Sequence, residues 1–172
     1  SIIPDNIYNA VENIKDDMPE NSCVVSWWDI GYYLQYSTNR QVVSDGGIYN
    51  GEYFYWLANI FTTDDPNLSI GICNMLKGGS LDASKIARTH TNSDKESVEL
   101  LKDILVLDKS DALDLLIKKY GFTEFDPNDL IVCSHPDIDK EMYLIISQDT
   151  ALKAGTIAYF GLWDFKDENI YS

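Results

Sequence analysis

The chain has 172 residues with 13 basic and 28 acidic side chains, which gives a net charge of −15 and an isoelectric point near 4.2. This strongly negative charge argues against nucleic acid as a partner and against electrostatic binding to anionic lipid. The length is typical of one domain, and an apolar content of 45% predicts a sizeable hydrophobic core.

Three widely spaced cysteines, Cys23, Cys73 and Cys133, form no CxxC pair. An odd number cannot all be paired within one chain, and the spacing does not indicate a structural zinc site. No apolar run approaches the roughly 18 residues of a membrane span. The chain begins at Ser1 without Met, so we expect a single soluble domain over residues 1–172, taken from a longer protein.

The first part of the chain predicts helices that alternate with short strands. Apolar residues recur at helical spacing after Pro4, and Pro19 ends this helix. Turn signals such as the pair Gly46 and Gly47 separate the following segments. The predicted elements are a helix at 4–18, a strand at 22–26, a helical turn at 32–36, a strand at 41–44, and helices at 53–61 and 68–76.

The second part of the chain is mainly helical in its pattern. Ser93 and Glu96 form a capping box, and Ser110 can cap another helix. Helices outnumber strands, so the expected fold class is a mixed α/β (α+β) domain, rich in helix, with a small sheet. The predicted elements are helices at 80–88, 93–105 and 110–117, a third strand at 129–134, and a helix at 141–157.

Trp27, Trp28 and Asp29 follow the first predicted strand, and Gly31 marks a turn. Three consecutive side chains alternate in a strand and fan out in a helix, so they converge only at a strand end or turn. Two indole N–H donors and one carboxylate complement an aliphatic hydroxyl, such as that of Ser or Thr, and would reject an analogue without it. The alternative is that both tryptophans lie in the core and Asp29 caps a helix.

Other patterns indicate weaker candidate sites. The four consecutive aromatic residues at 53–56 could stack on sugars, which predicts a carbohydrate-binding surface as an alternative to ordinary packing. Cys133 and His135 could form a nucleophilic pair, but no third orienting group is evident. The acidic run at 137–139 lacks the spacing of a calcium-binding loop.

Residues 26–32, which read Ser-Trp-Trp-Asp-Ile-Gly-Tyr, resemble the Trp-Trp-Asp-Tyr-Gly motif of the catalytic subunit of oligosaccharyltransferase. The segment at 42–47 is similar to the Val-Asp-Gly/Asn-Gly stretch of this family, and residues 95–101 are similar to the helix that follows. The resemblance is collinear over most of the chain. Its length is similar to the C-terminal globular domain of a short archaeal enzyme.

The resemblance implies that the domain recognises the acceptor sequon, Asn-X-Ser/Thr, within a protein N-glycosyltransferase that transfers a lipid-linked oligosaccharide to asparagine. Trp27, Trp28 and Asp29 would bind the Ser or Thr hydroxyl two residues after that asparagine. Ile30 stands where the family has Tyr. This difference does not affect the three proposed contact residues, but it leaves no Tyr hydroxyl at that position.

The family has a second motif on a kinked helix, with Asp and Lys three residues apart in one form and Met and Ile in the other. Residues 150–153, with an apolar residue four positions later at Ile157, have a similar spacing. They keep Lys153, whereas Thr150 takes the first position and Asp149 lies one residue earlier. The resemblance implies that Thr150, Lys153 and Ile157 contact the sequon. The alternative is a surface lysine on an amphipathic helix.

The implied chemistry is formation of a C–N bond between the Asn amide and the anomeric carbon of a glycan on a lipid phosphate. The amide is a poor nucleophile because its lone pair is delocalised, and the family overcomes this with acidic residues and Mn²⁺ or Mg²⁺ in its membrane half. We expect no catalytic residue and no metal ligand in this chain, an inactive isolated fragment, and a position on the extracytoplasmic face of a membrane. The alternative function is a non-catalytic carbohydrate-binding or structural domain.

Overall fold

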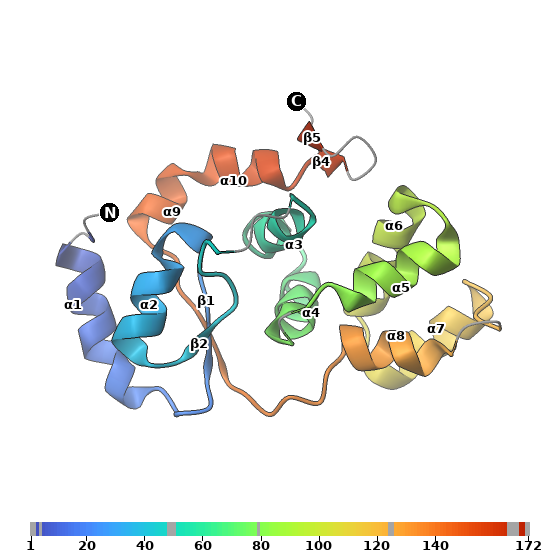
Figure 1. Cartoon of the computed structure of the whole chain (residues 1–172), viewed down its shortest axis with the longest axis horizontal. Helices are drawn as coiled ribbons and strands as arrows, with labels where there is room; N and C mark the ends of the chain where they lie inside the picture. Colours follow the sequence, from blue (N-terminus) through green and yellow to red (C-terminus); the bar gives the residue numbers. More distant parts are fainter. Residues whose placement is uncertain are drawn as a thin grey trace. The chain divides into compact units, whose positions relative to one another are not determined.

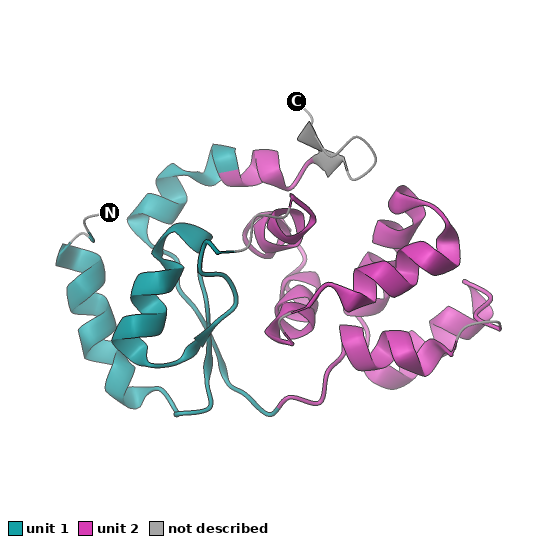
Figure 2. Ribbon diagram, in the orientation of Figure 1, with its two compact units in different colours: residues 1–50, 139–156 teal, residues 51–138, 157–172 magenta. Residues whose placement is uncertain are grey.

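A computed structural model describes residues 3, 5–47, 51–78, 80–123, 126–164 and 169–170 of the chain. Two compact units are present (Figure 2). Unit 1 contains Ser1–Asn50 and Asp139–Thr156, and unit 2 contains Gly51–Ile138 and Ile157–Ser172. Each unit therefore combines two segments that are distant in the sequence.

Unit 1 is built on a parallel three-stranded sheet (Figure 1). Strand β1 (Cys23–Val25) lies at the centre, between β2 (Gln41–Val42) and β3 (Met142–Leu144). All residues of β1 are buried, as a central parallel strand requires, which explains its uninterrupted apolar sequence. The ladders extend by one bond on each side: Val43 N donates to the Val24 carbonyl at 2.9 Å, and Ile145 N donates to that of Val25 at 2.8 Å.

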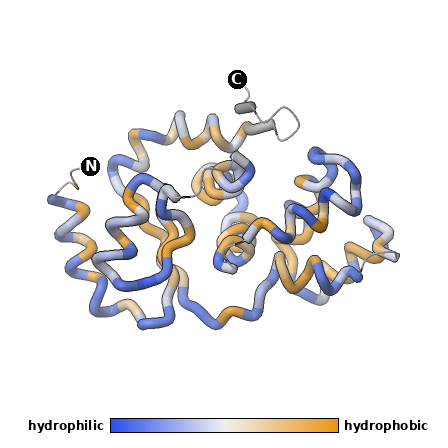
Figure 3. The backbone as a smooth tube through the Cα atoms, viewed as in Figure 1, coloured by the Kyte–Doolittle hydropathy of each residue, from blue (hydrophilic) through white to orange (hydrophobic). Residues whose placement is uncertain are grey.

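The helices of unit 1 bury apolar residues against this sheet. Ile7 and Val11 recur one turn apart on α1 and share a core cluster with Val24 of β1 and Leu34 of α2. Hydrophobic and hydrophilic positions alternate along α1 in Figure 3, as expected for an amphipathic helix. The helical segments are α1 (Asp5–Ile14), η1 (Lys15–Asp17), η2 (Trp28–Ile30), α2 (Gly31–Thr38), α9 (Gln148–Leu152) and the start of α10 (Ala154–Phe160).

Unit 2 is mainly helical and has its own core. Several of its helices begin where a side chain accepts bonds from free backbone N–H groups, for example Asp65 before α4, Ser93 before α6 and Asp126 before α8. A short antiparallel pair, β4 (Trp163–Asp164) and β5 (Asn169–Ile170), follows α10. The helices are α3 (Gly51–Thr62), α4 (Pro66–Lys77), α5 (Asp82–Thr91), α6 (Asp94–Leu105), α7 (Lys109–Lys118) and α8 (Pro127–Ser134).

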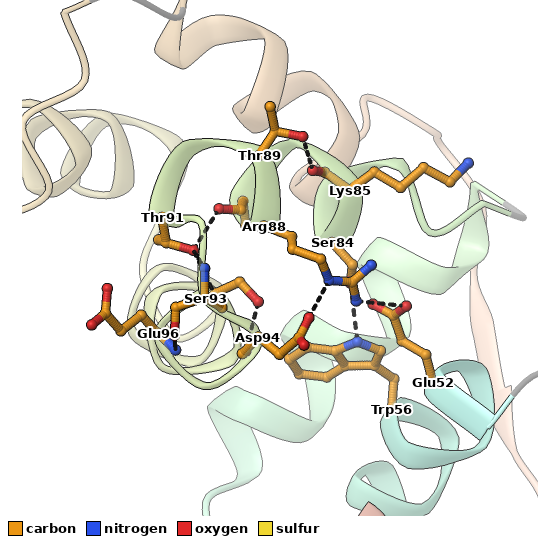
Figure 4. Close-up of polar contacts among 12 residues, drawn as sticks. Glu52, Trp56, Ser84, Lys85, Arg88, Thr89, Thr91, Ser93, Asp94 and Glu96 are labelled. Atoms are coloured by element: carbon orange, nitrogen blue, oxygen red, sulfur yellow. Dashed lines mark hydrogen bonds and ion pairs between the residues drawn. The ribbon is translucent and has the colours of Figure 1, made fainter. Parts of the chain in front are cut away.

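A polar network joins three of these helices (Figure 4). The guanidinium group of Arg88 on α5 forms ion pairs with Glu52 of α3 at 2.9 Å and with Asp94 of α6 at 2.5 Å. Nearby, Trp56 Nε1 donates to Ser84 Oγ at 3.1 Å. Because Glu52 and Trp56 are buried, these contacts satisfy polar groups that the core would otherwise leave without water.

The expected fold class is confirmed, because the chain is rich in helix and carries one small parallel sheet. The strand predicted at 129–134 is wrong, since this segment is helix α8. The buried residues Leu130, Ile131 and Ser134 follow helical spacing, and Pro127 occupies the first turn behind the Asp126 cap. The apolar run was too short for its periodicity to distinguish helix from strand.

The continuous helix predicted at 141–157 is also wrong. Its first residues form β3, which pairs with β1, and its remainder forms α9 and α10. The helix predicted to begin at Ser110 is instead capped by Asp108, whose side chain accepts a bond from Asp111 N at 2.9 Å. Within the described residues, no helix is both long enough and apolar enough to cross a bilayer.

Candidate functional site

The Trp-Trp-Asp segment lies just beyond the carboxyl end of β1. Trp27 is extended, and Trp28 and Asp29 begin the short helix η2 that leads into α2. The side chain of Trp27 is 3% exposed, whereas Trp28 and Asp29 are half-buried. The alternative in which Asp29 caps a helix is wrong, because the capping positions of η2 and α2 are Trp27 and Ile30.

The loop at 42–47 packs directly on the Trp-Trp-Asp segment and on Gly31, which follows it. A Cβ atom on Gly31 would lie 2.0 Å from the carbonyl oxygen of Ser44, so only glycine permits this approach. Gly46 has a φ of +81°, and a Cβ atom there would lie 3.2 Å from Cε3 of Trp28. The loop at 42–47 therefore covers one side of the Trp28 ring.

Asp29 and Lys153, which are 124 residues apart, meet in unit 1. The ammonium group of Lys153 forms an ion pair with Asp29 and a second ion pair with Asp149 of α9. The side chains of Lys153 and Asp29 are 40% and 22% exposed, so both can be reached from solvent. The hydrogen bond to Asp149, followed by that to Asp29, raises the pKa of Lys153 above its ordinary value. Lys153 therefore remains protonated at neutral pH.

Sequence reasoning placed Asp149 outside the motif, and the structure gives it a direct contact with Lys153. The two residues are four apart at the end of a helix, a spacing that places side chains on one face. This spacing was the signal that could have identified Asp149. The helix is interrupted at Lys153, where α9 ends and α10 begins.

Thr150 and Ile157 occupy different environments from Lys153. Thr150 is buried and completes a capping box, in which its N–H donates to Ser147 Oγ at 3.1 Å and its hydroxyl accepts from Ser147 N at 3.3 Å. Ile157 is buried on α10. Their roles as substrate contacts remain predictions.

The departure at Ile30 has a structural explanation. Ile30 is buried in the cluster of unit 1 that contains Ile7 and Leu34. A side chain at this position points into the packed interior, where a phenolic hydroxyl would need a hydrogen-bond partner. An apolar residue is therefore the simpler choice in this chain.

The aromatic run at 53–56 does not form a sugar-binding platform. Tyr53, Tyr55 and Trp56 are buried, and Phe54 packs on Phe160 with ring centroids 5.4 Å apart. The rings of Tyr55 and Trp56 meet edge to face at 5.1 Å. These contacts are those of a helix core, so the predicted carbohydrate-binding alternative is wrong for this surface.

Cys133 and His135 do not form a nucleophilic pair. Burial raises the pKa of Cys133, which disfavours the reactive thiolate. The imidazole of His135 is engaged by Ser134 Oγ at 2.8 Å and the Leu107 carbonyl at 3.2 Å. Among the described residues, no three His, Cys, Asp or Glu side chains lie together in a way that could hold a metal ion.

Comparison with known proteins identifies the family. The STT3/PglB/AglB core domain matches residues 20–167. The chain belongs to this family. The match includes both the Trp-Trp-Asp segment and the helix break at Lys153, and so the family resemblance drawn from these motifs is confirmed.

Two curated relatives from this family are both called dolichyl-phosphooligosaccharide-protein glycotransferase. The protein of Methanocaldococcus jannaschii is 36% identical over 157 residues, and that of Methanococcus voltae is 35% identical over 162 residues. These matches cover 88% and 91% of this chain but only 17% of each relative. A solved structure, the C-terminal domain of C. jejuni PglB, is 22% identical with a TM-score of 0.47, covering 89% of this chain and 51% of its own.

Proposed function

We propose that this chain is the acceptor-recognition domain of a longer protein N-glycosyltransferase, and that it binds the Ser or Thr of an Asn-X-Ser/Thr sequon. The observation that carries the proposal is the ion pair between Asp29 and Lys153. The sequence pointed to these residues separately, through two motifs, and they meet at a solvent-accessible position. The names of the curated relatives support a glycosyl transfer to protein.

The two charged groups suit a hydroxyl ligand. An ammonium group has three N–H donors, and among the described residues Lys153 donates to two carboxylates, which leaves one donor for a ligand. Asp29 uses Oδ2 for Lys153, and within the same described part of the chain Oδ1 has no hydrogen-bond partner. A Ser or Thr hydroxyl would donate to Oδ1 of Asp29 and accept from Lys153.

The tryptophans take a different part in this proposal. Trp27 is almost fully buried, and Nε1 of Trp28 lies beneath the surface. Their indole N–H groups reach a bound hydroxyl only if peptide binding moves the protein atoms that cover them. Asp29 and Lys153 are accessible without such a change. In the bound state the indoles shield the hydrogen-bonded hydroxyl from water, which strengthens its bonds.

The remaining parts of the reaction belong to the longer protein. The lipid-linked oligosaccharide, the catalytic acids and the Mn²⁺ or Mg²⁺ ion would be held by its membrane half, on the extracytoplasmic side. This chain would contribute by orienting the peptide. The isolated chain would then bind a sequon peptide weakly and would not glycosylate it.

The test is steady-state glycosylation of an Asn-X-Thr peptide by the full-length protein that carries this chain. Asp29→Ala and Lys153→Met should lower kcat/KM, because the first removes the acceptor for the hydroxyl and the second removes its donor and leaves Asp29 without its ion pair. A loss of about 1–3 kcal/mol corresponds to roughly 5-fold to 150-fold. Asp139→Asn, an exposed acidic residue of the same unit, is the matched control and should retain wild-type kinetics.

Thermal unfolding of each variant separates loss of recognition from loss of folding. The partly exposed pair contributes little to stability, so the melting temperature should change only slightly. Wild-type kcat/KM in both Asp29→Ala and Lys153→Met would disprove sequon recognition by this site.

A further inference from the structure

Lys153 is held at two points by a single residue. Its backbone N–H donates to the carbonyl of Asp149 at 3.0 Å, which closes the last turn of α9. Its ammonium group also donates to the carboxylate of the same Asp149. The flexible four-carbon stem of Lys153 is thereby anchored at both ends.

This anchoring determines where the ammonium group points. The side chain of Lys153 is 40% exposed, and an exposed lysine normally samples many rotamers. Asp149 lies one helical turn before Lys153, and Asp29 lies on η2 beyond the sheet. Two carboxylates that approach from different elements fix Nζ between them, so the remaining N–H has a defined direction.

On the basis of the function proposed above, we propose that Asp149 is a positioning residue for sequon recognition. It holds the ammonium group of Lys153 beside Asp29, so that Lys153 meets the acceptor hydroxyl without first losing rotamer entropy. Asp149 is not required to touch the peptide. The adjacent Thr150 cannot provide this function, because its hydroxyl is buried in the capping box with Ser147.

The arrangement predicts a specific kinetic signature in the full-length enzyme. Asp149→Asn should raise KM for an Asn-X-Thr peptide by about twofold to fivefold with little change in kcat, as expected for loss of one partly exposed ion pair. Asp149→Glu should restore most of the loss, because the longer carboxylate still reaches Lys153 from the same helix face. Asp139→Asn is again the matched control.

A double-mutant cycle distinguishes positioning from a general structural effect. If Asp149 acts through Lys153, Asp149→Asn should have no further effect on KM once Lys153 is Met. Heteronuclear NMR of lysine NH₃⁺ groups in the 172-residue chain provides a second readout. In the wild type the NH₃⁺ protons of Lys153 should exchange slowly with water, so that their signal is seen. In Asp149→Asn faster exchange should remove this signal.

The outcomes separate this inference from the proposed function. If Asp29→Ala raises KM while Asp149→Asn leaves it unchanged, Asp149 has no positioning role and sequon recognition stands. An effect of Asp149→Asn that persists undiminished in the Lys153→Met background also overturns positioning. If Asp29→Ala and Lys153→Met have wild-type kinetics, the proposed function itself fails.

Discussion

His135 directly follows α8 with its imidazole partly buried, and this burial lowers its pKa below 6.5 although the Leu107 carbonyl opposes the shift. Just below pH 6.5 the unfolded chain therefore binds a proton that the folded chain does not. The free energy of unfolding then rises with pH through this window and falls as the pH drops below 6.5. His135 thus contributes to acid sensitivity of unit 2.

The corresponding prediction concerns His135→Gln. This variant keeps a donor for the Leu107 carbonyl but cannot take up a proton, so the loss of stability from about pH 7 to about pH 5 should be smaller than in the wild type. Urea unfolding followed by circular dichroism at each pH gives the two slopes. Identical slopes for wild type and variant would show that His135 titrates equally in both states.

Single residues of the site were predictable only in part. Asp29 could be selected because a carboxylate suits a hydroxyl, and Lys153 because it matches a family motif, but their contact depends on tertiary structure. The burial of Trp27 was not predictable, since an indole at a strand end can face solvent or core. Asp149 was overlooked because it was compared with a motif rather than with helical geometry.

Two glycines in unit 1 provide a matched test of how elements pack. Gly31→Ala should destabilise the chain strongly, because the new Cβ would lie 2.0 Å from the Ser44 carbonyl oxygen and the backbone would have to move. Gly155→Ala should stabilise it by about 0.4–1 kcal/mol, since nothing lies within 4 Å and alanine favours the helix. Chemical denaturation of both variants measures the difference, and a tolerated Gly31→Ala would contradict the close approach of η2–α2 and the 42–47 loop.

At the level of elements, the sequence identified segments with strong local signals. The helices around Val11 and Leu101 have clear periodicity and agree with the structure. The errors at 129–134 and 141–157 lie where short apolar runs fit either helix or strand. Strand β3 forms because β1 offers an unpaired edge, and a partner 119 residues away, Met142 opposite Cys23, cannot be inferred from local pattern.

At the level of the whole molecule, electrostatics is dominated by the net charge of −15. Ion pairs such as Lys85–Asp82 and Lys118–Asp114 are exposed and one helical turn apart, so each contributes little. Repulsion among the excess carboxylates disfavours the compact state and is relieved when salt screens it. As salt is added, the stability gained from the relief of this repulsion should therefore outweigh the stability lost from the weakened ion pairs.

We accordingly expect the melting temperature to rise when NaCl increases from about 0.01 M to about 0.1 M, over which the screening length falls from about 30 Å to about 10 Å. Differential scanning calorimetry at constant pH measures this shift, and the low salt range limits specific ion effects. Replacing the exposed residues Asp16 and Asp64 with Lys should reduce the salt dependence, because the excess negative charge is smaller. A melting temperature that falls with salt would mean that attractive ion pairs, including Asp29–Lys153–Asp149, outweigh the repulsion.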